Sequence, residues 1–154
     1  MNIIKQIQAQ HAIADNAFAL LEQDAFARDD DTAFDSASEQ RRLNDQAYFL
    51  YLFTRFESEV NIAAESLLRV RKDISTPWLE RRVWDAWARN QVRDIPFLSK
   101  VEVLLDKSTP LFALVRDFYK RRNTIGHGSA WGDQLFIAVI AQELDEAISY
   151  FSQT

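Results

Sequence analysis

The stretch that decides the fold is "FLYLFTRFESEVNIAAESL", residues 49–67. Its apolar residues recur at steps of three and four, at Phe49, Leu52, Phe56, Val60, Ala63 and Leu67. Such steps place side chains on one face of an α-helix, and no Gly or Pro interrupts the pattern before Asp73. The sequence "SASE" at residues 36–39 fits a capping box that would start this helix. We therefore expect the longest helix here, about 35 residues in length.

Helical patterns also flank this stretch. An apolar stripe that includes Leu21 predicts a helix over residues 2–27, and the polar residues 28–36 separate it from the long helix. Thr76-Pro77 and Thr109-Pro110 each predict a helix start, because a proline in the first helical position loses no backbone hydrogen bond. Shorter helices are expected over residues 96–106 and 133–151, the second with Phe136 on its inward face.

Composition agrees with a helical domain. The 154 residues include three Gly and three Pro, and these are too few turn-forming residues for an all-β fold of this size. We expect an all-α fold, an antiparallel bundle of five to six helices with a long second helix, in one domain over residues 1–154.

The chain has no Cys and two His, so a zinc site would have to rely mainly on carboxylates. No cofactor or metal is expected. His11 falls on the apolar stripe of the first helix and is interpreted as a core or core-edge histidine with a satisfied ring nitrogen. Asp29, Asp30 and Asp31 are interpreted as a solvated loop. No apolar run reaches the roughly 20 residues of a membrane span, so a cytoplasmic protein away from membranes is expected.

Net charge is −5, but the charge is distributed unevenly. Residues 1–60 hold 11 acids and 5 bases, residues 61–122 hold 8 acids and 13 bases, and residues 123–154 hold 4 acids and no base. The middle of the chain is therefore basic, and it ends at the sequence "YKRRNTIGHGSAW", residues 119–131.

This basic sequence contains an arginine in an unexpected place. The inward stripe of the helix that starts at Pro110 reads Leu111, Val115 and Phe118, and the next member is Arg122. A buried guanidinium needs a counter-ion, a phosphate or an open cleft. Basic residues near a helix end and a left-handed cap at Gly126 would explain Lys120 and Arg121 without any function.

His127 follows Arg122 by five residues, a step of about 500° on a helix, which separates the two side chains by about 140°. They converge only if the backbone breaks between them, and Gly126-His127-Gly128 is the place where it could break.

The sequence "RNTIGHG", residues 122–128, resembles the signature of the HEPN superfamily (higher eukaryotes and prokaryotes nucleotide-binding), often Arg-Asn-x-Ile-Ala-His-Gly. Gly126 replaces the usual Ala. The segment "FTRFESEVN", residues 53–61, also resembles this family, and the resemblance covers about residues 40–149. It implies a metal-independent endoribonuclease, frequently a toxin or defence effector, with an active cleft formed by two subunits.

The chemistry of the residues fits that implication. RNA cleavage by its own 2′-hydroxyl needs a base, an acid and a cation beside the phosphate. Arg122 and His127 are the expected catalytic residues, and a homodimer would supply two of each. Asn123 would orient the histidine or contact the phosphate. Lys120, Arg121 and Arg116 would bind flanking phosphates of the RNA, with Glu57 behind Arg122.

Other interpretations remain open. Some family members carry a Tyr two residues after the His that a partner antitoxin modifies, but this chain has Ser129 there. Another antitoxin protein is possible. A non-catalytic HEPN-like module that binds RNA, nucleotide or protein is the main alternative, and a helical scaffold is the third. Residues 77–93 mix Trp and Arg and are expected to serve packing, RNA contact or the dimer interface.

Overall fold

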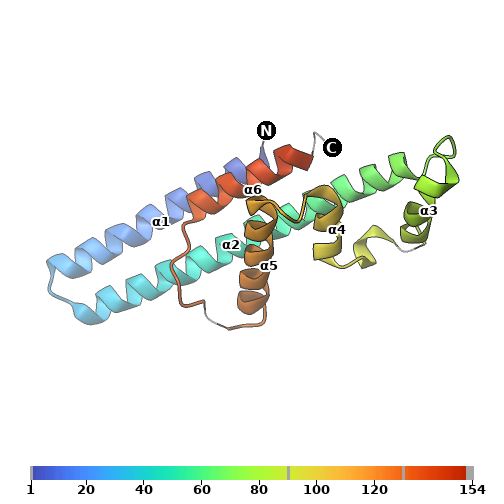
Figure 1. Cartoon of the computed structure of the whole chain (residues 1–154). Coiled ribbons are helices and arrows are strands. Elements are labelled where there is room, and N and C mark those ends of the chain that lie inside the picture. Colours follow the sequence, from blue (N-terminus) through green and yellow to red (C-terminus); the bar gives the residue numbers. More distant parts are fainter. Residues whose placement is uncertain (1, 90, 130, 152–154) are drawn as a thin grey trace. The chain divides into compact units, whose positions relative to one another are not determined.

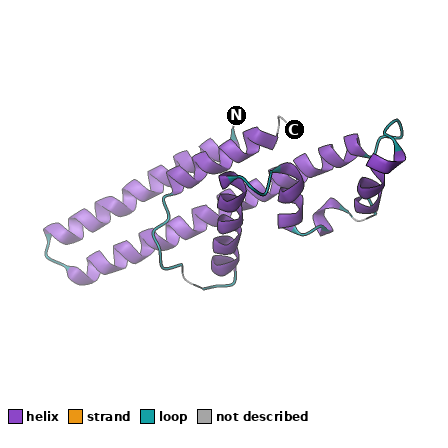
Figure 2. Ribbon diagram, viewed as in Figure 1, coloured by secondary structure: helices purple, strands orange, loops and turns teal. Residues whose placement is uncertain are grey.

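The computed structural model describes residues 2–89, 91–129 and 131–151 (Figure 1). This part of the chain forms helices and no strand, as Figure 2 shows, so the all-α prediction is confirmed. The elements are α1 (Ile3–Ala27), α2 (Asp31–Arg71), α3 (Trp78–Trp87), the short 3-10 helix η1 (Val92–Asp94), α4 (Phe97–Leu104), α5 (Pro110–Gly126) and α6 (Ile137–Phe151). Across the described residues, no helix is both long and apolar enough to cross a membrane.

The long second helix is confirmed, but it starts earlier than predicted. α2 has 41 residues and begins at Asp31, so the predicted capping box at residues 36–39 lies inside it. Asp30 is the N-cap of the helix instead, because its side-chain oxygen accepts a hydrogen bond from the Ala33 amide at 3.0 Å. Asp29 takes a left-handed backbone conformation with φ 56°, just after the Arg28 cap of α1. All three aspartates are exposed as predicted, but Asp31 is the first residue of α2 and not part of a loop.

The predicted helix start at Pro110 is confirmed, whereas the one at Pro77 is displaced by one residue. The Thr109 hydroxyl accepts a hydrogen bond from the Phe112 amide at 3.3 Å, and α5 begins at Pro110 as predicted. Pro77 instead lies one residue before α3 and caps it without a side-chain hydrogen bond. α6 begins at Ile137 rather than residue 133, and Phe136 is 60% exposed although it was predicted to point inward. Leu135 and Ile137 are buried in its place.

The helices form two compact units, residues 1–55 with 118–145 and residues 56–117 with 146–154. α2, α5 and α6 each contribute to both units. The one-domain prediction stays a prediction. Apolar side chains fill each unit. The first buries Ile4, Ile7, Phe49, Leu52, Phe53, Phe118, Ile137, Ile140 and Leu144, and the second buries Phe56, Val60, Ala64, Phe97, Val101, Leu104, Val115 and Ala147.

Within the first unit, α1 and the N-terminal part of α2 run antiparallel, as Figure 1 shows. Polar pairs connect them at successive levels: Ser38 donates to Glu22, Arg41 pairs with Asp15, and His11 contacts Asp45. The residue numbers in these pairs rise along α2 and fall along α1, as antiparallel helices require. The unit therefore carries a polar seam along its longest helix pair.

Candidate functional site

The sequence "RNTIGHG" lies at the C-terminal end of α5. The His127 amide donates to the Asn123 carbonyl at 3.0 Å, so the helical turn continues through His127. The Gly128 amide then bonds the Ile125 carbonyl at 2.9 Å, and the Ser129 amide bonds the Thr124 carbonyl at 3.1 Å. These bonds form a Schellman motif, which needs a left-handed residue after the helix. Gly128 supplies it with φ 82°, so the prediction of Gly126 as the left-handed cap is wrong.

The unbroken turn decides how Arg122 and His127 are oriented within one chain. The sequence offered residues 126–128 as the place where the backbone could break and bring the two together. The structure continues the helical hydrogen bonds through His127 and turns at Gly128, after both residues of the pair. On a regular helical turn, residues at this spacing point about 140° apart. Arg122 is half-buried and His127 is exposed.

The buried face of α5 also differs from the prediction. Its buried residues are Phe112, Val115, Phe118 and Ile125. Ile125 rather than Arg122 extends the apolar face into the last turn, and Arg122 lies at its margin. There the guanidinium donates to the Asn123 side-chain oxygen at 3.2 Å. The carboxamide of Asn123 therefore contacts Arg122, and its predicted role toward His127 stays a prediction.

The predicted phosphate-binding cations have different environments. Lys120 and Arg116 are exposed on α5. Arg121 is half-buried, with its guanidinium 5.7 Å from the ring centre of Phe118 and 5.4 Å from that of Trp131. A guanidinium at these distances from aromatic rings makes a cation–π contact. The Trp131 carbonyl further accepts hydrogen bonds from Arg42 at 3.1 Å and Gln46 at 3.3 Å. Arg121 therefore helps to hold the segment after α5 against the first unit.

Glu57 lies on α2 in the second unit. Burial lowers the pKa of Lys100 in the same unit, and the carboxylates of Glu57 and Asp94 oppose this lowering. Lys100 is 5% exposed and donates to the Val92 carbonyl at 3.3 Å. The predicted role of Glu57 behind Arg122 stays a prediction.

The Trp- and Arg-rich segment forms α3 in the second unit. Trp84 and Trp87 contact each other edge to face, with ring centres 6.2 Å apart. The Arg82 guanidinium lies 5.6 Å from the ring centre of Trp78, which is 62% exposed. Arg81 pairs with Asp85. The helix has no buried residue, so its rings are available for a partner as well as for packing.

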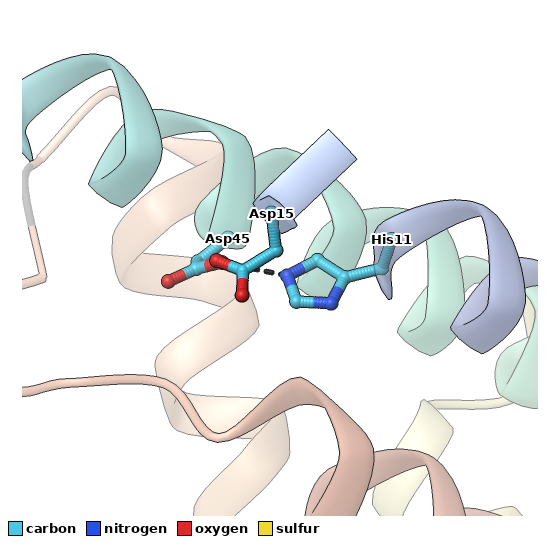
Figure 3. A group of neighbouring side chains, drawn as sticks. All are labelled: His11, Asp15 and Asp45. Atoms are coloured by element: carbon cyan, nitrogen blue, oxygen red, sulfur yellow. Dashed lines mark hydrogen bonds and ion pairs between the residues drawn. The ribbon is translucent and has the colours of Figure 1, made fainter. Parts of the chain in front are cut away.

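A second polar cluster was not predicted from the sequence. His11 and Asp15 of α1 point toward Asp45 of α2, as Figure 3 shows. His11 Nε2 lies 2.7 Å from Asp45 Oδ1, and its side chain is 11% exposed. The interpretation of His11 as a core-edge histidine with a satisfied ring nitrogen is therefore confirmed. The three side chains offer donor atoms that all lie within 4.8 Å of one another.

Arg41 organises the carboxylates around this cluster. Its guanidinium binds both oxygens of Asp15, at 2.5 and 2.9 Å, and one oxygen of Glu22 at 2.8 Å. The hydrogen bonds from Arg41 hold the pKa of Asp15 below its usual range. Burial raises the pKa of Asp45, although the contact with His11 opposes this rise. Asp15 therefore stays ionised at neutral pH.

The cluster opens onto a cavity of about 540 Å³ in the first unit. Four carboxylates line it, from Asp15, Glu22, Asp45 and Asp133, with two guanidinium groups from Arg41 and Arg42. The formal charge is thus −4 + 2 = −2 with His11 neutral. An RNA phosphate would be repelled here, so this cavity and the motif at Arg122 differ in the ligands that they suit.

Comparison of the chain with protein-family models, with curated proteins and with solved structures found no significant match.

Proposed function

We propose that the protein is a metal-independent endoribonuclease that acts as a homodimer through Arg122 and His127. What supports the proposal is the position of "RNTIGHG" at an accessible helix end: His127 is exposed beyond the last turn of α5, and Arg122 lies half-buried one turn earlier. The resemblance of this motif to the HEPN signature supplies the class of reaction.

The reaction is an internal transesterification. The RNA 2′-oxygen forms a bond to phosphorus while the bond from phosphorus to the 5′-oxygen breaks. One imidazole takes the 2′-hydroxyl proton, a second protonates the leaving 5′-oxygen, and a guanidinium stabilises the charge on the phosphoryl oxygens. The products are a 2′,3′-cyclic phosphate and a 5′-hydroxyl.

Two copies of the chain are required for geometric and chemical reasons. A regular helical turn points residues at the spacing of Arg122 and His127 about 140° apart, which does not favour a common phosphate within one chain. One chain also has one exposed imidazole in this region, whereas the reaction has two proton transfers. A twofold axis beside the end of α5 would pair the Arg122 of one subunit with the His127 of its partner.

The second candidate function is that of a non-catalytic module that binds RNA, nucleotide or protein through the same helix end. One observation favours it: Arg121 stacks on Phe118 and Trp131, so part of the basic sequence stabilises the fold. A toxin or defence role in the cytoplasm, controlled by an antitoxin protein, belongs to the first proposal and not to the second.

A mixing experiment tests the two-subunit site. Excess His127→Ala protein is combined with wild type, the dimers are allowed to exchange, and RNA cleavage per wild-type chain is measured. Mixed dimers hold one His127 imidazole, so activity per wild-type chain should fall steeply with excess variant. Matched excess of Arg28→Ala, an active variant changed at an exposed site at the end of α1, should instead leave cleavage per total chain constant. Unchanged activity with excess His127→Ala would argue against a shared site.

A further inference from the structure

The donors at His11, Asp15 and Asp45 form a set that metal ions bind. It offers one imidazole nitrogen and two carboxylate oxygens, with the nearest pair 2.7 Å apart and all donors within 4.8 Å. Donors that share a zinc ion at about 2.0–2.2 Å each lie roughly 3–4 Å from one another. The nearest pair is closer than that range and the other spacings do not exceed 4.8 Å, so small side-chain movements are needed to seat an ion among them.

The set comes from two elements with a fixed register. His11 and Asp15 are four residues apart and share one face of α1, while Asp45 faces them from α2 (Figure 3). Arg41 donates a hydrogen bond to each oxygen of Asp15, which fixes the orientation of this carboxylate. Each carboxylate oxygen keeps a second lone pair for another ligand. Partners that orient a ligand in this way are typical of metal sites.

Charge around the set favours a cation. Asp15, Glu22 and Asp45 carry −3 against +1 from Arg41, which leaves −2 while His11 is neutral. Arg42 is neutralised by Glu39, with which it forms an ion pair at 2.6 Å. A divalent cation would balance this excess, whereas an anion or a phosphate would add to it.

We propose that His11, Asp15 and Asp45 bind one divalent metal ion of the class that accepts mixed imidazole and carboxylate ligands, with Zn²⁺ as the probe. Three protein ligands leave coordination positions for water or a small molecule in the adjoining cavity, as in open zinc sites. This site is separate from the proposed ribonuclease residues and does not depend on them.

Calorimetric titration of chelator-treated, metal-free protein with Zn²⁺ tests the site. We expect saturable binding of one ion per chain in the micromolar range or tighter. Proton NMR identifies which of the chain's two histidines binds the ion. The ring resonances of His11 should shift on Zn²⁺ addition, while those of exposed His127 should not.

Matched variants complete the test. His11→Ala and Asp45→Asn should each weaken binding at least about 10-fold, the scale of losses at such sites. His127→Ala and Asp24→Asn, an exposed arginine-paired carboxylate on the same helix as Asp15, should bind like wild type. Circular dichroism identifies any variant that fails to fold, and Asp15→Asn then replaces it. Absence of saturable binding to wild type, or equal binding by His11→Ala and His127→Ala, would overturn the proposal.

Discussion

The guanidinium of Arg121 lies 5.4 Å from the ring centre of Trp131, ten residues further along the chain. It also lies 5.7 Å from the ring centre of Phe118 on its own helix. This stacking anchors the segment that follows "RNTIGHG". A residue that the sequence suggested as a phosphate contact is thus part of the support of the motif.

Replacing Arg121 by Ala should therefore lower stability. A cation–π contact contributes about 0.5–2 kcal/mol, depending on its exposure. We expect the free energy of unfolding in urea to fall by about 1 kcal/mol. The matched change Lys120→Ala, at an exposed neighbour, should alter it by less than about 0.5 kcal/mol. Equal stability of the two variants would mean that the stacking contributes nothing.

Gly128 and Gly126 should respond differently to alanine. Gly128 has φ 82°, where an L residue is strained, so Gly128→Ala should cost about 1–2 kcal/mol. Gly126 is the last residue of α5, and an added Cβ would meet nothing within 4 Å. Gly126→Ala should be neutral or stabilise by up to about 1 kcal/mol, because Ala favours helix. Thermal unfolding of both variants measures the difference, and similar effects would contradict the assigned helix end.

Lys100 should reduce stability at neutral pH. Burial lowers its pKa from the usual 10.5, so the folded state disfavours the charged form. The penalty is complete below the folded pKa and is lost as the pH rises through 10.5, above which lysine is neutral in both states. Lys100→Met should stabilise by about 1 kcal/mol at pH 7, with a smaller gain near pH 10.

Urea unfolding of Lys100→Met and wild type at both pH values checks this prediction. The difference between the two proteins is the informative quantity, since other titrating groups affect both alike. A gain that grows with pH, or a large loss at pH 7, would show that the hydrogen bond to Val92 outweighs the burial of the charge.

Helical periodicity was sufficient to predict the first helix and the long α2, and together with the few Gly and Pro it predicted the all-α fold. The Thr109-Pro110 pair predicted the start of α5. It was less reliable for the inward face of each helix. Leu21 and Phe136 lie on predicted inward stripes but are 52% and 60% exposed. An apolar stripe shows which residues share one face of a helix. Which of them are buried depends on the part of the chain that packs against that face. For the same reason Ile125, and not Arg122, is buried in the last turn of α5.

The cluster around His11 was only partly visible in the sequence. His11 and Asp15 are four apart on a predicted helix, which is a detectable pair. Asp45 lies 34 positions beyond His11, and its approach depends on the register of α1 against α2. Apolar spacing does not specify that register. The early start of α2 at Asp30 and Asp31, which sets the length of the connection, was also missed.

The central claim is that Arg122 and His127 cleave RNA without metal, and the most direct measurement is incubation of purified protein with a long RNA in excess EDTA. We predict cleavage by wild type, with 2′,3′-cyclic phosphate ends, and a loss of at least about 100-fold in folded Arg122→Ala and His127→Ala. Arg28→Ala, which removes an exposed guanidinium from α1, should cleave like wild type. No cleavage by wild type, or undiminished cleavage by His127→Ala, would contradict the claim.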